Sequence, residues 1–224
     1  MTIYDGLPPF NPYFQTEKGT VEFSDISQKR ILQEVARAVE YLPNGTQLKI
    51  KEELDLDEDL FAIAFKNLRK DNPCTHRQDI QFRILSGIAY YNKAYHRLGH
   101  KNSAKCTFCP EKEQDFIHLY IKCPEVKRFR SRLSENWPGE KMDVKRWFLG
   151  ASITDDILEK SKNIIAKEAN HYIFKMNWAN KDLSFDAFKN WLKSDEEPEE
   201  ALAMRINKVF DHHLKWSQIQ LLLN

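Results

Sequence analysis

The sequence is short of the two residues that most often interrupt helices. Glycine occurs 7 times and proline 9 times in 224 residues, where average usage would give roughly 12% for the two together. This scarcity predicts a mostly α fold and argues against a turn-rich β-sandwich. Hydrophobic residues make up 42% and aromatic residues 12% of the chain, so a sizeable core can form and a disordered composition is excluded.

Long apolar runs are also missing. The longest joins Phe61 to Phe65, whereas a bilayer span needs roughly 20 residues. The first residues, MTIYDGLPPF, lack the basic-then-apolar pattern of a signal peptide. We therefore expect an intracellular protein, in the nucleus or the cytoplasm, with no membrane partner. Because these compartments keep thiols reduced, the four cysteines call for an explanation other than disulfides.

The net charge of +1 conceals a strong segregation of charge. Residues 1–60 carry 6 Lys or Arg and 12 Asp or Glu, a net of −6, while residues 61–146 carry 18 and 9, a net of +9. Residues 147–224 carry 10 and 12, a net of −2. A basic middle between acidic flanks is consistent with a polyanionic partner. It is equally consistent with charged side chains that merely alternate on solvated faces of the protein.

Hydrophobic periodicity and capping residues predict helices along most of the chain. Asp57 or Asp59 caps a helix through Leu68, Thr75 opens a capping box, and Gly99 ends a helix. The expected helices cover 27–42, the segment up to 68, a segment from 75, 91–98, 125–137, 155–178, 184–193 and 199–222. Residues 1–23 are expected to be irregular and 46–50 a short strand. We divide the chain into an acidic N-terminal segment with one helix (1–57), a basic region (58–150) and a C-terminal helical tail (151–224).

The basic region contains a pattern typical of a metal site. Cys106, Cys109, His118 and Cys123 follow the spacing C-x2-C-x8-H-x4-C, which suits one tetrahedral Zn²⁺ with four protein ligands and no position for water. The pattern predicts a small CCHC zinc module embedded among helices and holding one structural ion. We expect His118 on a short helix capped by Asp115, with Cys123 just past its end. The alternative is a set of ordinary buried thiols and a surface histidine.

Cations and aromatic residues alternate on both sides of this pattern. Cations can follow phosphates and rings can stack on unpaired bases, so the cluster predicts contact with RNA or DNA, single-stranded or structured. Alternatively the rings belong to the core and the cations only solubilise the protein. The candidate nucleic-acid-binding residues are Lys93, Arg97, Lys101, Lys105, Lys122, Lys127, Arg128, Arg130 and Arg132, and the interleaved rings are Tyr90, Tyr91, Tyr95, Phe108, Tyr120 and Phe129.

Two stretches together resemble a known family. One runs from Arg97-Leu98-Gly99-His100 through Ser103 and the four Cys and His residues to Pro124. It resembles the zinc-binding region after the polymerase of non-LTR (LINE-type) retrotransposon reverse transcriptases. The other contains His171-Tyr172-Ile173-Phe174-Lys175, Trp178, Asn180-Lys181 and Leu183-Ser184-Phe185, and it resembles the helical tail that follows this region. The resemblance covers roughly residues 77–216.

The resemblance implies the C-terminal part of such a reverse transcriptase, either a fragment or a remnant gene. By family, Cys106, Cys109, His118 and Cys123 bind zinc, the region binds element RNA or target DNA, and another retrotransposon-encoded protein is a possible partner. Aromatic-x-Asp-Asp and Pro-Asp-x-Asp motifs are missing, so we expect no polymerase, no nuclease and no other enzyme. A zinc-scaffolded protein-interaction module is the alternative, and a hydrolase using Cys74 and His76 is a third hypothesis.

Overall fold

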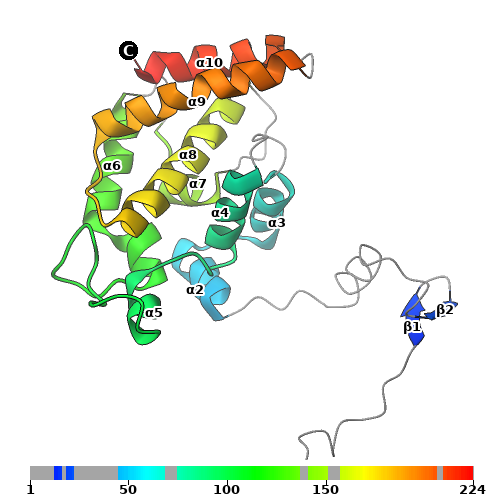
Figure 1. The fold of residues 1–224 in the computed structure, drawn as a ribbon, viewed down its shortest axis with the longest axis vertical. Coiled ribbons are helices and arrows are strands. Elements are labelled where there is room, and N and C mark those ends of the chain that lie inside the picture. The colour runs from blue at the N-terminus through cyan, green and yellow to red at the C-terminus, as the bar shows by residue number, and fades with distance from the viewer. Residues whose placement is uncertain are drawn as a thin grey trace, which may run out of the picture. The chain divides into compact units, whose positions relative to one another are not determined.

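The computed structural model describes residues 13–16, 19–22, 45–68, 75–136, 141–150, 157–205 and 209–223 (Figure 1). The chain forms two compact units, residues 1–43 and 44–224, and each is described by itself. The divisions expected after residues 57 and 150 both fall inside the second unit and stay predictions. The helices in the described residues of the second unit are α2 (Gly45–Leu54), α3 (Glu58–Lys66), α4 (Thr75–Leu85), α5 (Asn92–Arg97), the π-helix η2 (His118–Lys122), α6 (Pro124–Glu135), α7 (Val144–Leu149), α8 (Ile157–Ala179), α9 (Phe185–Arg205) and α10 (Val209–Leu223).

The first unit contains an antiparallel hairpin. Strand β1 (Tyr13–Thr16) pairs with β2 (Gly19–Glu22), and Phe14 lies opposite Val21. The expectation of an irregular segment over 1–23 is therefore wrong for these eight positions. Two four-residue strands are too short to show a sustained alternation of apolar and polar residues. The helix expected over 27–42 lies outside the described residues.

The second unit opens with a helix where a short strand was expected. The prediction for residues 46–50 is wrong, because they belong to α2. Gln47, Ile50 and Leu54 are the buried residues of α2, and their spacing of three and four places them on one helix face. The next helix, α3, begins as predicted, since Asp57 accepts a hydrogen bond from the backbone N–H of Leu60 at 2.6 Å.

Helix α8 is the centre of the second unit. It packs against α4, α7, α9 and α10 (Figure 1), and every residue from Ser161 to Ile173 is buried. The helices expected over 155–178 and 125–137 are confirmed as α8 and α6. Apolar side chains from α2 through α10 form one contiguous core. The described part of the chain is thus mostly helical, as the composition predicts.

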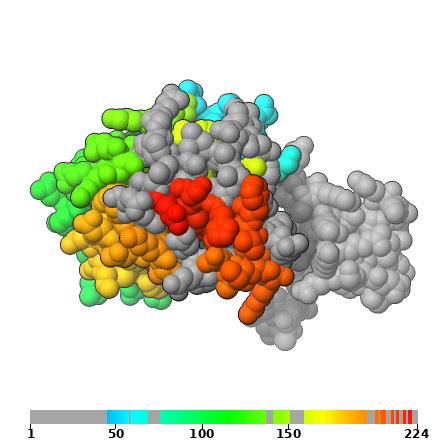
Figure 2. All heavy atoms as spheres, turned by 90° about the horizontal axis from the view of Figure 1, so that it is seen from above, coloured from blue at the N-terminus to red at the C-terminus, as the bar shows by residue number. Residues whose placement is uncertain are grey.

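Helices α9 and α10 differ from the expected pattern. Ser184 caps α9 as predicted, through a 3.2 Å bond from the backbone N–H of Ala187 to its hydroxyl. However, α9 continues through the acidic segment and Pro198 to Arg205, so the predicted end near 193 and the predicted start at 199 are wrong. Local breaker residues were outweighed by packing of α9 against α8 and α10. Figure 2 shows α9 and α10 next to each other across one face of the unit.

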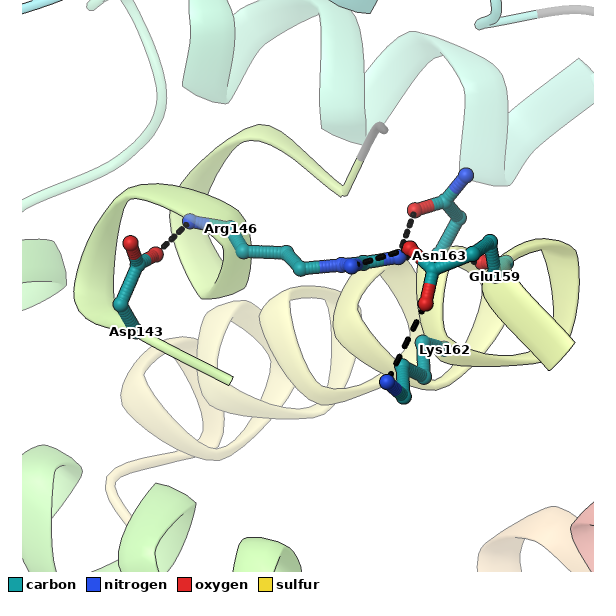
Figure 3. A network of polar contacts seen from close by, with 5 residues as sticks. All are labelled: Asp143, Arg146, Glu159, Lys162 and Asn163. Atoms are coloured by element: carbon teal, nitrogen blue, oxygen red, sulfur yellow. Dashed lines mark hydrogen bonds and ion pairs between the residues drawn. The ribbon is translucent and has the colours of Figure 1, made fainter. Parts of the chain in front are cut away.

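A polar network fastens α7 to α8 (Figure 3). Asp143 caps α7 by accepting a 2.7 Å bond from the backbone N–H of Arg146. The guanidinium of Arg146 reaches α8, where it pairs with Glu159 and donates to the Oδ1 of Asn163 at 3.3 Å. Lys162 pairs with the same Glu159 at 3.1 Å. These partly buried contacts hold α7 against the middle of the fold.

Gly150 should be sensitive to substitution. It ends α7 in the left-handed region, with φ of 57°, and an added Cβ would lie 2.6 Å from Cγ of Lys167. A side chain costs roughly 1–2 kcal/mol in this backbone region, and Lys167 would also have to move. We expect Gly150→Ala to lower the free energy of unfolding in urea by about 1–3 kcal/mol. Gly45→Ala is the control because an added Cβ there meets nothing within 4 Å, and an equal loss in both variants would contradict this account.

The helices of the described residues include none that is both long and apolar enough to cross a bilayer. The expected compartment, nucleus or cytoplasm, stays a prediction.

Candidate metal centre

Three segments bring the four predicted ligands together. Cys106 and Cys109 lie in the loop after α5, His118 begins η2, and Cys123 is the N-cap of α6. Their ligand atoms all lie within 4.8 Å of one another. The Sγ atoms of Cys109 and Cys123 are 3.7 Å apart, those of Cys106 and Cys123 are 3.9 Å apart, and Nε2 of His118 lies 3.1 Å from Sγ of Cys109. These four side chains can hold one metal ion, as their spacing predicts.

Backbone hydrogen bonds shape the loop that carries the first two ligands. The N–H of Cys106 donates to the carbonyl of Lys112 at 2.8 Å, and the N–H of Gln114 donates to the carbonyl of Ala104 at 2.8 Å. Lys105 and Glu113 form an isolated antiparallel bridge between these two bonds. The loop is therefore closed at its base, and the thiols of Cys106 and Cys109 lie next to the ligand atoms of His118 and Cys123.

The wider turn of the π-helix brings the last two ligands, His118 and Cys123, close to each other. Residues five positions apart do not lie above one another on an α-helix, with its 3.6 residues per turn. In η2 the backbone N–H of Cys123 donates to the carbonyl of His118 at 2.6 Å, which is the i to i−5 bond of a wider turn. Asp115 caps the helix by accepting from the N–H of His118 at 2.7 Å. The predicted short helix and its cap are confirmed, whereas its π character was not predicted.

Gln114 is a buried residue of the site that the sequence analysis missed. Its Nε2 donates to Sγ of Cys106 at 3.3 Å and to Oδ1 of Asn177 in α8 at 2.9 Å. Its Oε1 accepts from the backbone N–H of Asn92 at 2.8 Å. The side chain is 0% exposed and joins a ligand to two helices. A lone glutamine inside the ligand loop carries no sequence signal that could have identified it.

The three thiols affect one another's ionisation. The hydrogen bond between Cys106 and Cys123 lowers the pKa of Cys106 to about 3 and raises the pKa of Cys123 far above its ordinary value. Burial raises the pKa of Cys109. A divalent cation bound by these ligands favours the thiolate form of each cysteine, because a coordinating thiol gives up its proton.

Most of the predicted nucleic-acid-binding cations lie at the surface. Lys93, Lys122 and Arg128 pair with Glu113, Glu53 and Glu125, respectively. Nζ of Lys101 lies 5.6 Å from the ring centre of Tyr90, and the guanidinium carbon of Arg132 lies 4.8 Å from that of Phe185. The remaining exposed cations of the set are Arg97, Lys105 and Lys127.

Arg130 departs from this pattern and is a correction to the predicted set. Its side chain is 3% exposed and donates to the carbonyl of Tyr120 at 2.6 Å and to Oδ1 of Asn170 at 2.7 Å. It therefore belongs to the interior between α6, η2 and α8 and is withdrawn as a contact for nucleic acid. Its neighbours Lys127, Arg128 and Arg132 stay exposed on the outer face of α6.

The interleaved rings are mainly core residues. Tyr90, Phe108, Tyr120 and Phe129 are each at most 9% exposed, so the interpretation of these four rings as core residues is confirmed. Phe129 packs against Tyr172 of α8 and Phe188 of α9, and Tyr120 packs against Phe116. Tyr91 and Tyr95 are half-buried. Cys74 lies outside the described residues. The hypothesis of a hydrolase that uses Cys74 and His76 therefore stays a prediction.

Comparisons of the chain with family models, with curated proteins and with solved structures find no match. A function must therefore be argued from the chemistry of the site together with the sequence resemblance.

Proposed function

We propose that this protein is a zinc-stabilised nucleic-acid-binding module. We infer further that it derives, as a fragment or a remnant, from the C-terminal part of a non-LTR retrotransposon reverse transcriptase and has no polymerase or nuclease site of its own. The resemblance of residues 77–216 to that family supports the origin. The metal centre and the exposed cations beside it support the activity.

The donor set supports zinc as the metal. In a tetrahedral site with Zn–S bonds of about 2.3 Å, neighbouring sulfur atoms lie roughly 3.8 Å apart. The Sγ–Sγ distances from Cys123 to Cys109 and to Cys106, 3.7 and 3.9 Å, agree with this spacing. The 3.1 Å contact between Cys109 and Nε2 of His118 is shorter, and it would lengthen slightly around an ion. Three thiolates and one imidazole also match the ligands of structural zinc sites.

The surroundings support a structural role for the ion. Cys123 is 0%, Cys106 2% and His118 9% exposed, and four side-chain ligands leave no coordination position for water or substrate. Cys123 also lies at the N-terminus of α6, where the helix dipole favours a thiolate. The ion would thus join the loop, η2 and α6 and would do no chemistry itself.

One observation carries the proposal of nucleic-acid binding. Helix α6 begins directly after the ligand Cys123, so the metal centre fixes the orientation of a helix that exposes Lys127, Arg128 and Arg132. The same centre anchors the loop that exposes Lys105. Because these cations are already exposed and lie on elements held in place, they can contact the phosphates of a nucleic acid without any buried side chain having to move out.

A salt titration tests this proposal. We expect the full chain to bind a labelled single-stranded oligonucleotide, with log K falling as log salt rises. Because each phosphate contact contributes about 0.7 to this slope for single strands, combining Lys127→Ser, Arg128→Ser and Arg132→Ser should flatten the slope by about 2. Fluorescence anisotropy over a potassium chloride series measures this change, and metal analysis should show unchanged zinc.

The matched control removes three exposed cations from other helices. Lys49→Ser, Lys193→Ser and Arg205→Ser take the same charge from α2 and α9, and they should leave the slope nearly unchanged. An equal effect of both triple variants would mean that overall charge decides binding. No binding at low salt would contradict the proposal and favour the protein-interaction module.

A further inference from the structure

A cavity on the second unit has the character of a stacking site. It measures about 390 Å³ and lies between α4, the segment before α5, α5 itself and the end of α8. Its lining includes Arg83, Ile88, Tyr90, Tyr95, Lys175 and Trp178. Ile88 is 59% and Trp178 56% exposed. Large apolar side chains with so much free surface, at the mouth of a cavity, are typical of a binding surface rather than of a core.

The rings of this cavity are held in place by one another. Trp178 packs edge-on against Tyr90 at 4.8 Å between ring centres and against Tyr95 at 6.0 Å, and the two tyrosines are 4.4 Å apart. Tyr90 is 5% exposed and donates from its hydroxyl to Oδ1 of Asn92 at 3.0 Å. Trp178 therefore presents free ring surface from a fixed position, which lowers the entropy cost of stacking a ligand on it.

The metal centre supports both sides of this cavity. Gln114, which donates to the ligand Cys106, also bonds Asn177 and Asn92. Asn177 directly precedes Trp178, and Oδ1 of Asn92 accepts a hydrogen bond from the hydroxyl of Tyr90. The two ring-bearing segments are thus joined through one buried glutamine to the cluster of ligands.

The charges around the cavity favour an anion-bearing ligand. Lys175 lines it, and Nζ of Lys101 lies 5.6 Å from the ring centre of Tyr90. The acidic residue among the described lining residues is Asp79, and it is bonded to Arg83 at 2.8 Å. An aromatic surface with flanking cations matches an unpaired nucleobase with its phosphates better than an apolar peptide.

We propose that this cavity binds an unpaired nucleobase of single-stranded nucleic acid, with the base stacked on Trp178 and a neighbouring phosphate near Lys175 or Lys101. This inference rests on the proposed function and adds to it the form of the ligand. A paired base cannot enter, because its faces are covered by its neighbours in the duplex. The site therefore selects single strands, whereas the cations of α6 follow any phosphate backbone.

Trp178→Ala in the full chain tests this inference with labelled oligouridylate, oligothymidylate and a duplex of the same length. We expect affinity for both single strands to fall by roughly 5- to 150-fold, the effect of one stacked base. The salt slope and the zinc content should stay unchanged, and duplex binding should not weaken. Trp178→Phe should keep part of the affinity, because a smaller ring still stacks.

Two controls separate stacking from loss of structure. Phe210→Ala removes a ring that is 77% exposed on α10, and it should leave all affinities unchanged. Ile88→Glu, at the mouth of the cavity, should weaken single-strand binding through its carboxylate even if Trp178→Ala folds poorly.

The outcomes distinguish this inference from the proposed function. Wild-type affinity in both Trp178→Ala and Ile88→Glu, with a flattened slope in the α6 triple variant, would overturn the stacking site and leave nucleic-acid binding standing. An equal loss on single strands and duplex would also overturn it. Failure of the wild-type chain to bind any oligonucleotide at low salt would overturn both.

Discussion

Cys109→Ser is expected to release the metal and to unfold the segment around it. Structural zinc contributes about 10–16 kcal/mol of apparent binding free energy in small zinc modules, as much as the whole stability of a typical domain. We expect the free energy of unfolding to fall by about 5 kcal/mol or more. Metal analysis, circular dichroism and urea unfolding of the purified variant measure the three expected losses of zinc, helix and stability.

The loss should extend beyond the loop itself. Helix η2 has five residues, too few to be stable alone, and its side chains Leu119 and Tyr120 are 0% exposed. Phe116, just before η2, packs against Phe148 of α7 with ring centres 6.3 Å apart. Once the ion is gone, these side chains lose their position in a core that they share with α7 and α8. A purely local effect would show as unchanged unfolding of the remaining helices.

Cys74→Ser is the matched control for the metal experiment. Cys74 lies 32 positions before Cys106, and four ligands already complete a tetrahedron. This variant should retain one zinc per chain. Loss of zinc from Cys74→Ser, or full zinc in Cys109→Ser, would contradict the ligand set.

Local chemistry explains what the sequence predicted correctly. The ligands Cys106, Cys109, His118 and Cys123 lie within 18 residues, so their spacing alone restricts them to one small loop and a turn. Capping at Asp57, Asp115 and Ser184 was predictable for the same reason, because a cap bonds an N–H only three positions away. Helices α6 and α8 carry apolar residues at helical spacing, and this pattern does not depend on distant neighbours.

Distant neighbours explain what the sequence could not predict. Gln114 meets Asn177 across 63 positions, and Asn170 meets Gln81 across 89. Each is an ordinary polar residue until the helices are packed. The π form of η2 depends on the approach of His118 to Cys123, and the continuation of α9 past 193 depends on its packing with α8 and α10. Tertiary contacts outweighed the local signals at these places.

Arg130 shows this limit most clearly and leads to the second large effect. In the sequence of α6, Arg130 is one of four similar cations. In the structure its guanidinium is buried and joins Tyr120 of η2 to Asn170 of α8. Asn170 in turn donates to the carbonyls of Trp147 and Phe148 at 3.0 and 3.1 Å. One arginine thus completes a chain of hydrogen bonds that links η2, α6, α7 and α8.

Arg130→Met is expected to lower the free energy of unfolding by about 3 kcal/mol or more, since a hydrogen bond to a charged group contributes roughly 1.5–3 kcal/mol and two are lost. Urea unfolding measures the loss. Burial lowers the pKa of Arg130 to about 10, so the group is charged in the folded and unfolded states below about pH 9. The loss should therefore be the same between about pH 6 and 8.

Arg128→Met is the control on the same helix, because that side chain is 74% exposed and pairs with Glu125 one turn away. Exposed pairs of this kind contribute roughly 0.3–0.5 kcal/mol, so stability should hardly change. In nucleic-acid titrations we expect the reverse order, since Arg128 is available to phosphates and Arg130 is not. A similar loss of stability in both variants, or a reduced salt slope in a folded Arg130→Met protein, would show that the two arginines share a role and that the interior position of Arg130 is unimportant.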